Sequence, residues 1–361
     1  MKSAVMRGAL YQDFFVKIYL ERCINMSKVT VIIPAYNAEP YIHKCLKSIV
    51  NQSYTDYDVL IVNDGSSDNT ESILIEYKNK YSFVDYCNKE NGGLSSARNF
   101  GMRQLNGSKY VVFVDSDDYV DRDYLLKLVT VAEQNQSDMV CSGQYRVTEE
   151  GQILQRVQYH LDTQGKCILR RLNMSGKLYR VEYIKQHNLT FPEGKVYEDN
   201  PFNLAAYFLS SHIDFLQYEG YYQLVHLDSI TAKKIGRDSI PFKELEQSVK
   251  YVIEKSPNDY NVFEYTLMSF LTYFILEANR KHRYLKLKGR KSDIPLLEEL
   301  CDYARNLLEL YCPSYIHNPY LSIFKKNDIE MKQKLAVAVF ARMLHFKCAK
   351  IFVKIFYKLF G

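Results

Sequence analysis

The sequence predicts an α/β fold in which a mostly parallel sheet carries helices on both of its faces. From Met26 onward, short apolar runs rich in β-branched residues alternate with segments of helical periodicity. The connections are short, and polar residues follow the end of each apolar run. This alternation is typical of parallel sheets. Ligands bind at the carboxyl ends of the strands in such sheets, so these polar residues indicate a binding site.

Composition supports a globular protein of two or three domains, or one large domain with an appendage. The chain has 361 residues, of which 47% are hydrophobic and 25% are charged. Its eight cysteines form no CxxC pair, which favours free thiols in a reducing compartment. The net charge of +5 is too small to indicate nucleic-acid binding.

Residues 1–25 are predicted to be an N-terminal extension outside the core. Charges are spread along this segment, and it lacks the uncharged apolar core and small-residue cleavage site of a signal peptide. We expect the compact domain to begin at Met26.

The first two strands and the helix between them are clear in the pattern. An apolar run over 29–33 predicts a buried strand closed by Pro34. The loop 35–39 follows, Pro40 suits the first turn of a helix, and the 3.6-residue period over 42–50 predicts that helix. A second strand over 57–62 ends in the turn cluster 63–70.

The next segment continues the alternation. A helix is expected over 70–81 and a strand over 83–87. A glycine turn at 91–93 then leads into a helix whose first turns carry Ser96 and Arg98.

The strand predicted over 111–114 ends abruptly in the carboxylates of Asp115, Asp117 and Asp118. Adjacent acids at the end of a buried strand are costly unless a cation lies beside them. A hard divalent cation that also binds a phosphate would meet that need. The alternative is that one Asp caps the helix expected over 121–134, which would explain a single acid but not all three.

Other strand ends carry side chains that suit a nucleotide. Tyr36 can stack on a base, Asp64 can accept a base N–H, and Arg98 can bind a phosphate. Each alone could be an ordinary loop or capping residue, but together at one sheet edge they favour a nucleotide site. No GxGxxG follows the first strand and no P-loop is present, which disfavours a Rossmann dinucleotide site.

Four motifs resemble those of the family-2 glycosyltransferases, the inverting enzymes of GT-A fold that act in bacterial polysaccharide synthesis. The motifs are Val-Ile-Ile-Pro-Ala-Tyr-Asn at 31–37, Asn-Asp-Gly-Ser at 63–66, Glu-Asn-Gly-Gly-Leu-Ser-Ser-Ala-Arg-Asn at 90–99 and Val-Asp-Ser-Asp-Asp at 114–118. The resemblance implies a GT-A fold, a nucleotide-diphosphate sugar donor and Mn²⁺ or Mg²⁺.

The resemblance also assigns roles to residues. Pro34, Tyr36 and Asp64 are expected to face the base. Asp115 and Ser116 are expected near the ribose and diphosphate, and Asp117 as a metal ligand in a DXD motif. Further nucleotide-sugar-binding residues are expected at Asn37, Glu39, Ser96 and Arg98. The family usually has Asp where this chain has Asn63.

The middle of the chain predicts a strand over 139–145 and a hairpin over 147–157. Segments 176–180 and 191–202 are similar to family segments in which an acidic pair opens a helix and supplies the general base. That pair here is Glu198 and Asp199, before an apolar helix over 202–209. Successive helical residues diverge by about 100°, so one acid faces the acceptor, and we assign Asp199 as the base. The alternative is favourable charge at a helix N-terminus.

A late histidine often adds a metal ligand in GT-A enzymes, and His226 is the candidate here. The alternative is an ordinary polar residue at a strand end. Lys233, Lys234 or Arg237 could balance the diphosphate charge.

The pattern after about residue 240 is helical. Helices are expected over 244–255, 260–280 and 294–311, and a last helix over 332–360 contains no acid. Its stripe of Lys347, Lys350, Lys354 and Lys358 suits the surface of an anionic membrane. The alternative is packing on the rest of the domain. Charges recur too often for it to span a membrane.

The sequence thus predicts a GT-A domain over 26–238 and a helical region over 239–361. We expect a metal-dependent inverting glycosyltransferase, of hexosyl or N-acetylhexosaminyl type, that modifies a hydroxyl of a glycan or lipid-linked acceptor in cell-surface polysaccharide assembly. We expect it in the cytoplasm, peripheral on the inner face of the membrane, without a nucleic-acid partner. The alternatives are a nucleotidyltransferase and a sugar-nucleotide-binding or scaffold protein without turnover.

Overall fold

The computed structural model describes residues 28–105, 107–159, 172–226, 237–255, 257, 259–277, 293–322 and 331–360. The extension expected over 1–25 lies outside these residues.

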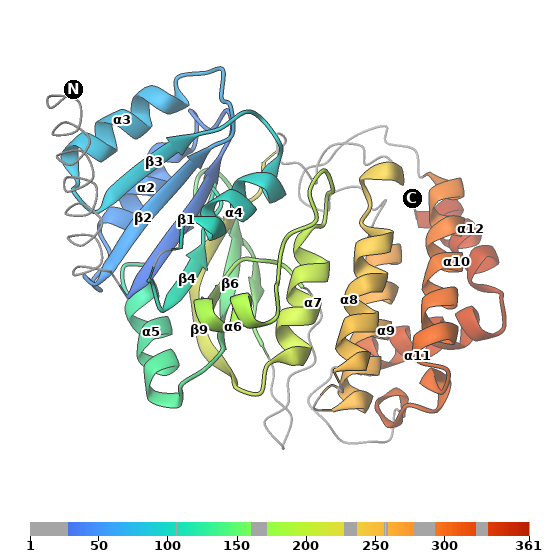
Figure 1. Ribbon diagram of the computed structural model, residues 1–361. Helices are drawn as coiled ribbons and strands as arrows, with labels where there is room; N and C mark the ends of the chain where they lie inside the picture. The colour runs from blue at the N-terminus through green and yellow to red at the C-terminus, as the bar shows by residue number, and fades with distance from the viewer. Residues whose placement is uncertain are drawn as a thin grey trace, which may run out of the picture.

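A single mixed sheet forms the left half of the molecule in Figure 1. Within the described residues it has nine strands in the order β3-β2-β1-β4-β8-β6-β9-β5, with β7 on β6. The strands are β1 (Val29–Ala35), β2 (Tyr57–Asn63), β3 (Val84–Asn88), β4 (Tyr110–Phe113), β5 (Tyr119–Val120), β6 (Met139–Val147), β7 (Ile153–Val157), β8 (Lys177–Arg180) and β9 (Ile213–Leu224). Strands β3, β2, β1 and β4 are parallel, and β8 is antiparallel to β4. The expected α/β fold with a mixed GT-A sheet is confirmed.

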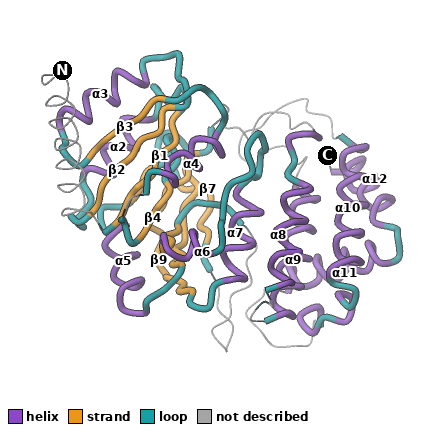
Figure 2. Tube along the Cα trace, in the orientation of Figure 1, coloured by secondary structure: helices purple, strands orange, loops and turns teal. Residues whose placement is uncertain are grey.

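Helices cover both faces of the sheet and form a separate layer beyond it (Figures 1 and 2). Those associated with the sheet are α2 (Ile42–Val50), α3 (Thr70–Lys80), α4 (Leu94–Arg103), α5 (Tyr124–Asn135), α6 (Val181–Gln186) and α7 (Asp199–Leu209). The C-terminal layer contains α8 (Phe242–Glu254), α9 (Tyr260–Glu277), α10 (Ile294–Tyr311), α11 (Met331–His345) and α12 (Ala349–Phe360). The helical C-terminal region is therefore confirmed.

Alternate residues of the central strands enter two different hydrophobic clusters. Val31 and Ile33 pack in the cluster that contains α2 and α5, whereas Ile32 packs in the cluster that contains α6 and α7. Side chains alternate across a strand, so a run that is apolar at every position buries both faces of the sheet. Gly101 lets α4 approach, because an added Cβ would lie 2.7 Å from Cγ2 of Ile32.

Element boundaries differ from expectation at two places near the sheet edge. Pro34 does not close β1, because the strand continues to Ala35 and Pro34 pairs with Val62 of β2. The helix expected from residue 121 begins at Tyr124, since the N–H of Asp123 is held in a turn by the side chain of Asp121 at 2.8 Å.

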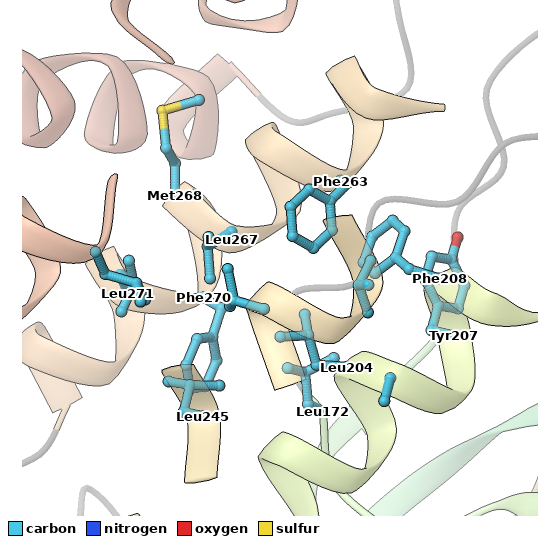
Figure 3. Close-up of a cluster of buried hydrophobic side chains, with 14 of the residues drawn as sticks. Leu172, Leu204, Tyr207, Phe208, Leu245, Phe263, Leu267, Met268, Phe270 and Leu271 are labelled. Carbon is cyan, nitrogen blue, oxygen red and sulfur yellow. The ribbon is translucent and has the colours of Figure 1, made fainter. Parts of the chain in front are cut away.

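The C-terminal helices share a hydrophobic core with the sheet. The cluster that begins at Ile32 and Phe113 continues through α7 to α12. Figure 3 shows its centre, where Leu204 and Phe208 of α7 face Phe263 and Leu267 of α9. The boundary placed between residues 238 and 239 stays a prediction of domain organisation, and the core crosses it.

The prediction of one last helix over 332–360 is wrong. The chain forms α11 and α12, which are separated at residues 346–348, where Lys347 takes a left-handed φ of 60°. Helix α12 then packs along α10, and the Lys350 and Lys354 ammonium groups bind the carboxylates of Asp302 and Glu298 at 2.5 Å. Two lysines of the expected membrane stripe therefore face acids of the same protein.

None of the helices in the described ranges combines the length and hydropathy needed to cross a membrane.

The shared core predicts that the sheet and the C-terminal helices unfold together. Phe263 is fully buried and its ring lies 4.9 Å from that of Phe208, so Phe263→Ala should lower the free energy of unfolding by about 3–5 kcal/mol. Phe346→Ala is the matched control, because Phe346 is 70% exposed and its removal should change stability by less than about 0.5 kcal/mol. Chemical denaturation measures both. Two separate transitions in the wild type would contradict a common core.

Candidate active site

The loops that follow β1, β2 and β4 meet at one edge of the sheet. Asp64 donates its backbone N–H to the carbonyl of Ala35 at 2.8 Å, and Val114 donates to Ile32 at 3.1 Å. These bonds extend the parallel pairing just past the strand ends. The polar residues that follow each strand therefore lie side by side, as the strand order requires.

The first loop, residues 36–39, is fastened to the turn after β2. The Asn37 side-chain oxygen accepts the N–H of Ser67 at 2.8 Å, and the Glu39 carboxylate accepts the N–H of Asn69 at 3.1 Å. Tyr36 is 54% exposed, whereas Pro34 is buried in β1. Asn37 and Glu39 thus shape the loop, and the large aromatic side chain of Tyr36 is exposed to solvent.

Asp64 organises the glycine turn before α4. Its carboxylate accepts from the Lys89 ammonium at 2.5 Å and from the N–H groups of Gly92 and Gly93 at 3.0 and 2.7 Å. Gly93 has a φ of 85°, which favours glycine. A carboxylate has about four acceptor sites, so one remains for a ligand N–H.

Arg98 is enclosed between two carboxylates. Its guanidinium donates to Asp115 and to Glu198, both at 2.6 Å, and the side chain is 2% exposed. Burial lowers the pKa of Arg98, but Asp115 and Glu198 outweigh this and raise it, so the guanidinium stays charged. Nε of Arg98 is buried without a hydrogen-bond partner in the described residues, and the expected phosphate contact stays a prediction. Ser96, two residues earlier on α4, is also buried.

Asp118 has a structural role in the acidic loop. Its carboxylate accepts from the hydroxyl of Tyr221 at 2.7 Å and from the N–H of Leu224 at 2.8 Å. Burial and the nearby carboxylates of Asp117 and Asp115 raise the pKa of Asp118. The alternative that Asp117 or Asp118 caps the next helix is wrong, because Asp123 occupies the N-cap of α5.

Asp117 and His226 come together although 109 residues separate them. A carboxylate oxygen of Asp117 lies 2.8 Å from Nε2 of His226, and the His226 ring packs 4.5 Å from that of Tyr41. Two ligands of one ion at about 2.1 Å lie about 3 Å apart, so this pair fits a shared divalent cation. Asp117 keeps a side-chain exposure of 30%. In the described part of the chain, no group of three or more metal-ligating side chains is preformed.

Ser116 lies partly buried between Asp115 and Asp117. Of the residues considered for diphosphate charge, Lys233 and Lys234 lie outside the described residues, and Arg237 binds Glu299 at 2.6 Å.

Glu198 and Asp199 have different surroundings at the start of α7. Glu198 is the N-cap residue and its carboxylate is bound by Arg98. Asp199 is the first helical residue, and its carboxylate has no hydrogen bond or ion pair to any described residue. Burial, followed by the charge of Glu198, raises the pKa of Asp199 to about 7. A carboxylate with such a pKa is suited to accept a proton near neutral pH.

Three residues important to this geometry were not identified from the sequence. The Tyr221 hydroxyl donates to the Asp118 carboxylate and accepts the backbone N–H of Asp115 at 3.2 Å. The other two are Tyr41, which packs on His226, and Lys89, which pairs with Asp64. Tyrosine and lysine at these positions carry no local signal, because each acts on a partner from a distant segment.

The chain is similar to known glycosyltransferases. Residues 30–194 match the family described as Glycosyl transferase family 2. Over 206 residues the chain is 35% identical to the glycosyltransferase GlyA of Streptococcus pneumoniae, covering 52% of this chain and 29% of that protein. It is 31% identical over 204 residues to the poly(ribitol-phosphate) β-N-acetylglucosaminyltransferase TarS of Staphylococcus aureus, covering 55% of this chain and 35% of TarS. The matches thus span about a third of each relative.

Solved structures share the fold. Residues 1–349 of S. aureus TarS in complex with UDP align with a TM-score of 0.64 and 21% identity, covering 92% of this chain and 91% of that one. The mannosyltransferase PcManGT from Pyrobaculum calidifontis, in complex with GDP-Man and Mn²⁺, aligns with a TM-score of 0.50 and 16% identity, covering 89% and 88%. Residues 30–194 contain the four strand-end motifs, and this part of the chain matches the family-2 glycosyltransferases, in agreement with its GT-A sheet.

Proposed function

We propose that this protein is a metal-dependent inverting glycosyltransferase that moves a sugar from a nucleotide-diphosphate donor to an acceptor hydroxyl. The observation that carries the proposal is the buried Arg98. It joins Asp115, on the donor side, to Glu198, next to the candidate base Asp199. The Arg98 side chain thereby links the loop proposed to bind the donor to the start of α7, which carries the candidate base. The donor site and the candidate base are therefore held in fixed positions relative to each other.

The donor is proposed to lie across the edge formed by β1, β2 and β4. Pro34, Tyr36 and Asp64 would contact the base, and Asp115 and Ser116 the ribose and diphosphate. Asn37, Glu39, Ser96 and Arg98 would act by shaping the loops that hold it. TarS has been solved with UDP and with UDP-GlcNAc, so uridine diphosphate sugars are the first donors to test.

Asp199 is proposed to accept the proton of the acceptor hydroxyl. The hydroxyl oxygen attacks the anomeric carbon as the bond to the diphosphate oxygen breaks on the opposite face, so the configuration inverts. Glu198 remains paired with Arg98 and keeps the start of α7 in place. The free carboxylate of Asp199 and its raised pKa support turnover over a binding-only protein.

Asp117 and His226 are proposed to hold Mn²⁺ or Mg²⁺ together with the donor diphosphate. The ion would supply charge neutralisation for the departing diphosphate. The 2.8 Å approach of the two side chains supports this pairing. Nδ1 of His226 is buried without a hydrogen-bond partner in the described residues, so it can carry the ring proton when Nε2 binds the ion.

The acceptor is proposed to be a glycan or lipid-linked acceptor of cell-surface polysaccharide assembly, reached from the inner face of the membrane. The surface formed by α11 and α12 supports peripheral attachment. It exposes the apolar side chains of Met331, Leu335, Val339, Phe346, Ile351 and Ile355. Lys332 and Arg342 lie exposed among them and form no ion pair with described residues. A surface that exposes both apolar and basic side chains is suited to binding an anionic bilayer.

Replacing the base should reveal its role. Asp199→Asn keeps size but removes basicity, so single-turnover transfer should fall by roughly 10² to 10⁴ with little change in donor affinity. In the wild type the rate should rise with pH and level off above about 7, because only the ionised Asp199 accepts a proton. Glu198→Gln should have a smaller effect on turnover. Near wild-type transfer by Asp199→Asn, with Glu198→Gln inactive, would reverse the roles.

Removing a metal ligand should weaken metal-dependent donor binding. Asp117→Ala and His226→Ala should each weaken binding of UDP in Mn²⁺ by about tenfold or more, since either change leaves one protein ligand. Thermal stabilisation by UDP with Mn²⁺ measures this. Glu149→Ala, an exposed acid in the hairpin between β6 and β7, is the matched control. Unchanged stabilisation of Asp117→Ala would show that its assigned role is wrong.

Attachment to membranes should depend on exposed cations rather than on those paired within the protein. Lys332→Gln with Arg342→Gln should reduce sedimentation with phosphatidylglycerol vesicles, at about 1 kcal/mol per charge. Lys350→Gln with Lys354→Gln is the matched control, because these lysines bind Asp302 and Glu298 and should contribute less. Equal loss in both variants would contradict the assignment of this surface.

A further inference from the structure

A basic pocket lies between α2 and β5, outside the residues assigned to the donor. It has a volume of about 490 Å³ and is lined by Lys44, Lys47, Ser48, Asn51, Tyr119 and Arg122. This volume suits a phosphate together with a sugar or polyol unit attached to it.

The pocket carries three cations and no acid. Lys44, Lys47 and Arg122 are exposed, and none of them forms an ion pair with another described residue. The Lys44 ammonium lies 3.9 Å from the centre of the Tyr119 ring, and this cation–π contact holds the ammonium over the Tyr119 wall of the pocket. Isolated surface lysines are usually just solvated, but three unpaired cations around one concave site favour an anion. Lysine and arginine both bind phosphate oxygens well.

The walls of the pocket are held rigidly. Val120 donates its N–H to the hydroxyl of Ser48 at 3.1 Å, which joins β5 to α2. The carbonyl of Arg122 accepts the N–H of Ser53 at 2.9 Å. The ring of Tyr119 stacks on that of Tyr222 at 4.7 Å between centroids. A ligand would therefore enter a preformed site, which reduces the ordering cost of binding.

The pocket adjoins the candidate metal site. Tyr119 follows Asp117 by two residues. On the α2 wall, Lys44 lies one helical turn beyond Tyr41, and the Lys44 N–H donates to the Tyr41 carbonyl at 3.0 Å. The ring of Tyr41 in turn packs on that of His226. A molecule bound here would therefore extend toward the reacting centre from the side of Tyr41 and His226.

We propose that this pocket binds a phosphate group of the acceptor. The inference rests on the proposed function and deepens it, because it names the acceptor class as phosphate-bearing. The phosphate is either a phosphodiester of a polymer or the diphosphate of a lipid carrier, and the two share the chemistry that the cations recognise.

Direct titration of the full chain tests the proposal with three soluble probes. These are a ribitol phosphate oligomer, geranyl diphosphate and the neutral polyol ribitol. The triple variant Lys44→Gln, Lys47→Gln, Arg122→Gln should bind the preferred anionic probe about tenfold or more weakly, since each exposed charge pair contributes up to about fivefold. The oligomer identifies a polymer phosphodiester, and geranyl diphosphate identifies a carrier diphosphate. Ribitol should not bind.

A second triple variant, Lys80→Gln, Lys243→Gln, Lys255→Gln, removes the same charge from exposed sites away from the pocket and should bind as the wild type does. Stabilisation by UDP with Mn²⁺ should be unchanged in both triple variants. Wild-type affinity of the pocket variant for the anionic probes, or no binding of either probe by the wild type, overturns the proposal. Loss of UDP binding in the pocket variant would instead assign the pocket to the donor and also overturns it. Failure of the wild type to bind any uridine diphosphate sugar would count against the proposed function, whatever the anionic probes show.

Discussion

The buried guanidinium of Arg98 is the interaction on which the candidate site depends. It comes from α4 and binds Asp115 after β4 and Glu198 before α7, so three distant segments meet at one side chain. Burying an unpaired charge is costly, and removing one partner of such a pair costs about 3–5 kcal/mol. Asp115 and Glu198 each bind a different terminal nitrogen of Arg98, so both segments are held at the same side chain.

The same contact separates the roles of two adjacent acids. Glu198 is tied to Arg98, whereas Asp199 has no partner among the described residues and is affected mainly by burial and by its neighbour. Two adjacent carboxylates in different surroundings can perform different tasks. The ring of Phe202 in α7 stacks on that of Phe191 at 4.2 Å between centroids, and the Arg98 guanidinium lies over the Phe191 ring.

The C-terminal helices support the site indirectly through α7. Their side chains join the hydrophobic cluster that begins on the sheet, so α7 is packed from both sides. A helix held in this way can present Asp199 in a defined position, as catalytic groups require. Two ion pairs join α10 and α12, and the exposed apolar side chains of α11 and α12, together with Lys332 and Arg342, form the proposed membrane surface.

The sequence by itself determined the order and type of most described elements, although its pattern does not predict β5, β8 or α6 and predicts one helix in place of α11 and α12. Runs that are apolar at every position required strands buried on both faces, and parallel connection required their polar ends to share an edge. Asp64, Asp115 and Asp117 could therefore be placed at one edge, and the four motifs indicated the family that the match over residues 30–194 confirms. Local pattern was sufficient for these conclusions because each depends on residues close together in the chain.

Only the tertiary structure decided which partner each polar side chain has. The Tyr221 hydroxyl donates to Asp118 rather than to Asp117, and Arg98 pairs with carboxylates rather than facing solvent. Local sequence could not show these contacts, because the partners lie about 100 residues away or come from another strand. The break at Lys347 was also invisible, since neither glycine nor proline marks it and the helical period continues through it. Packing of α12 on α10 favours that turn, and packing between distant segments cannot be read from periodicity alone.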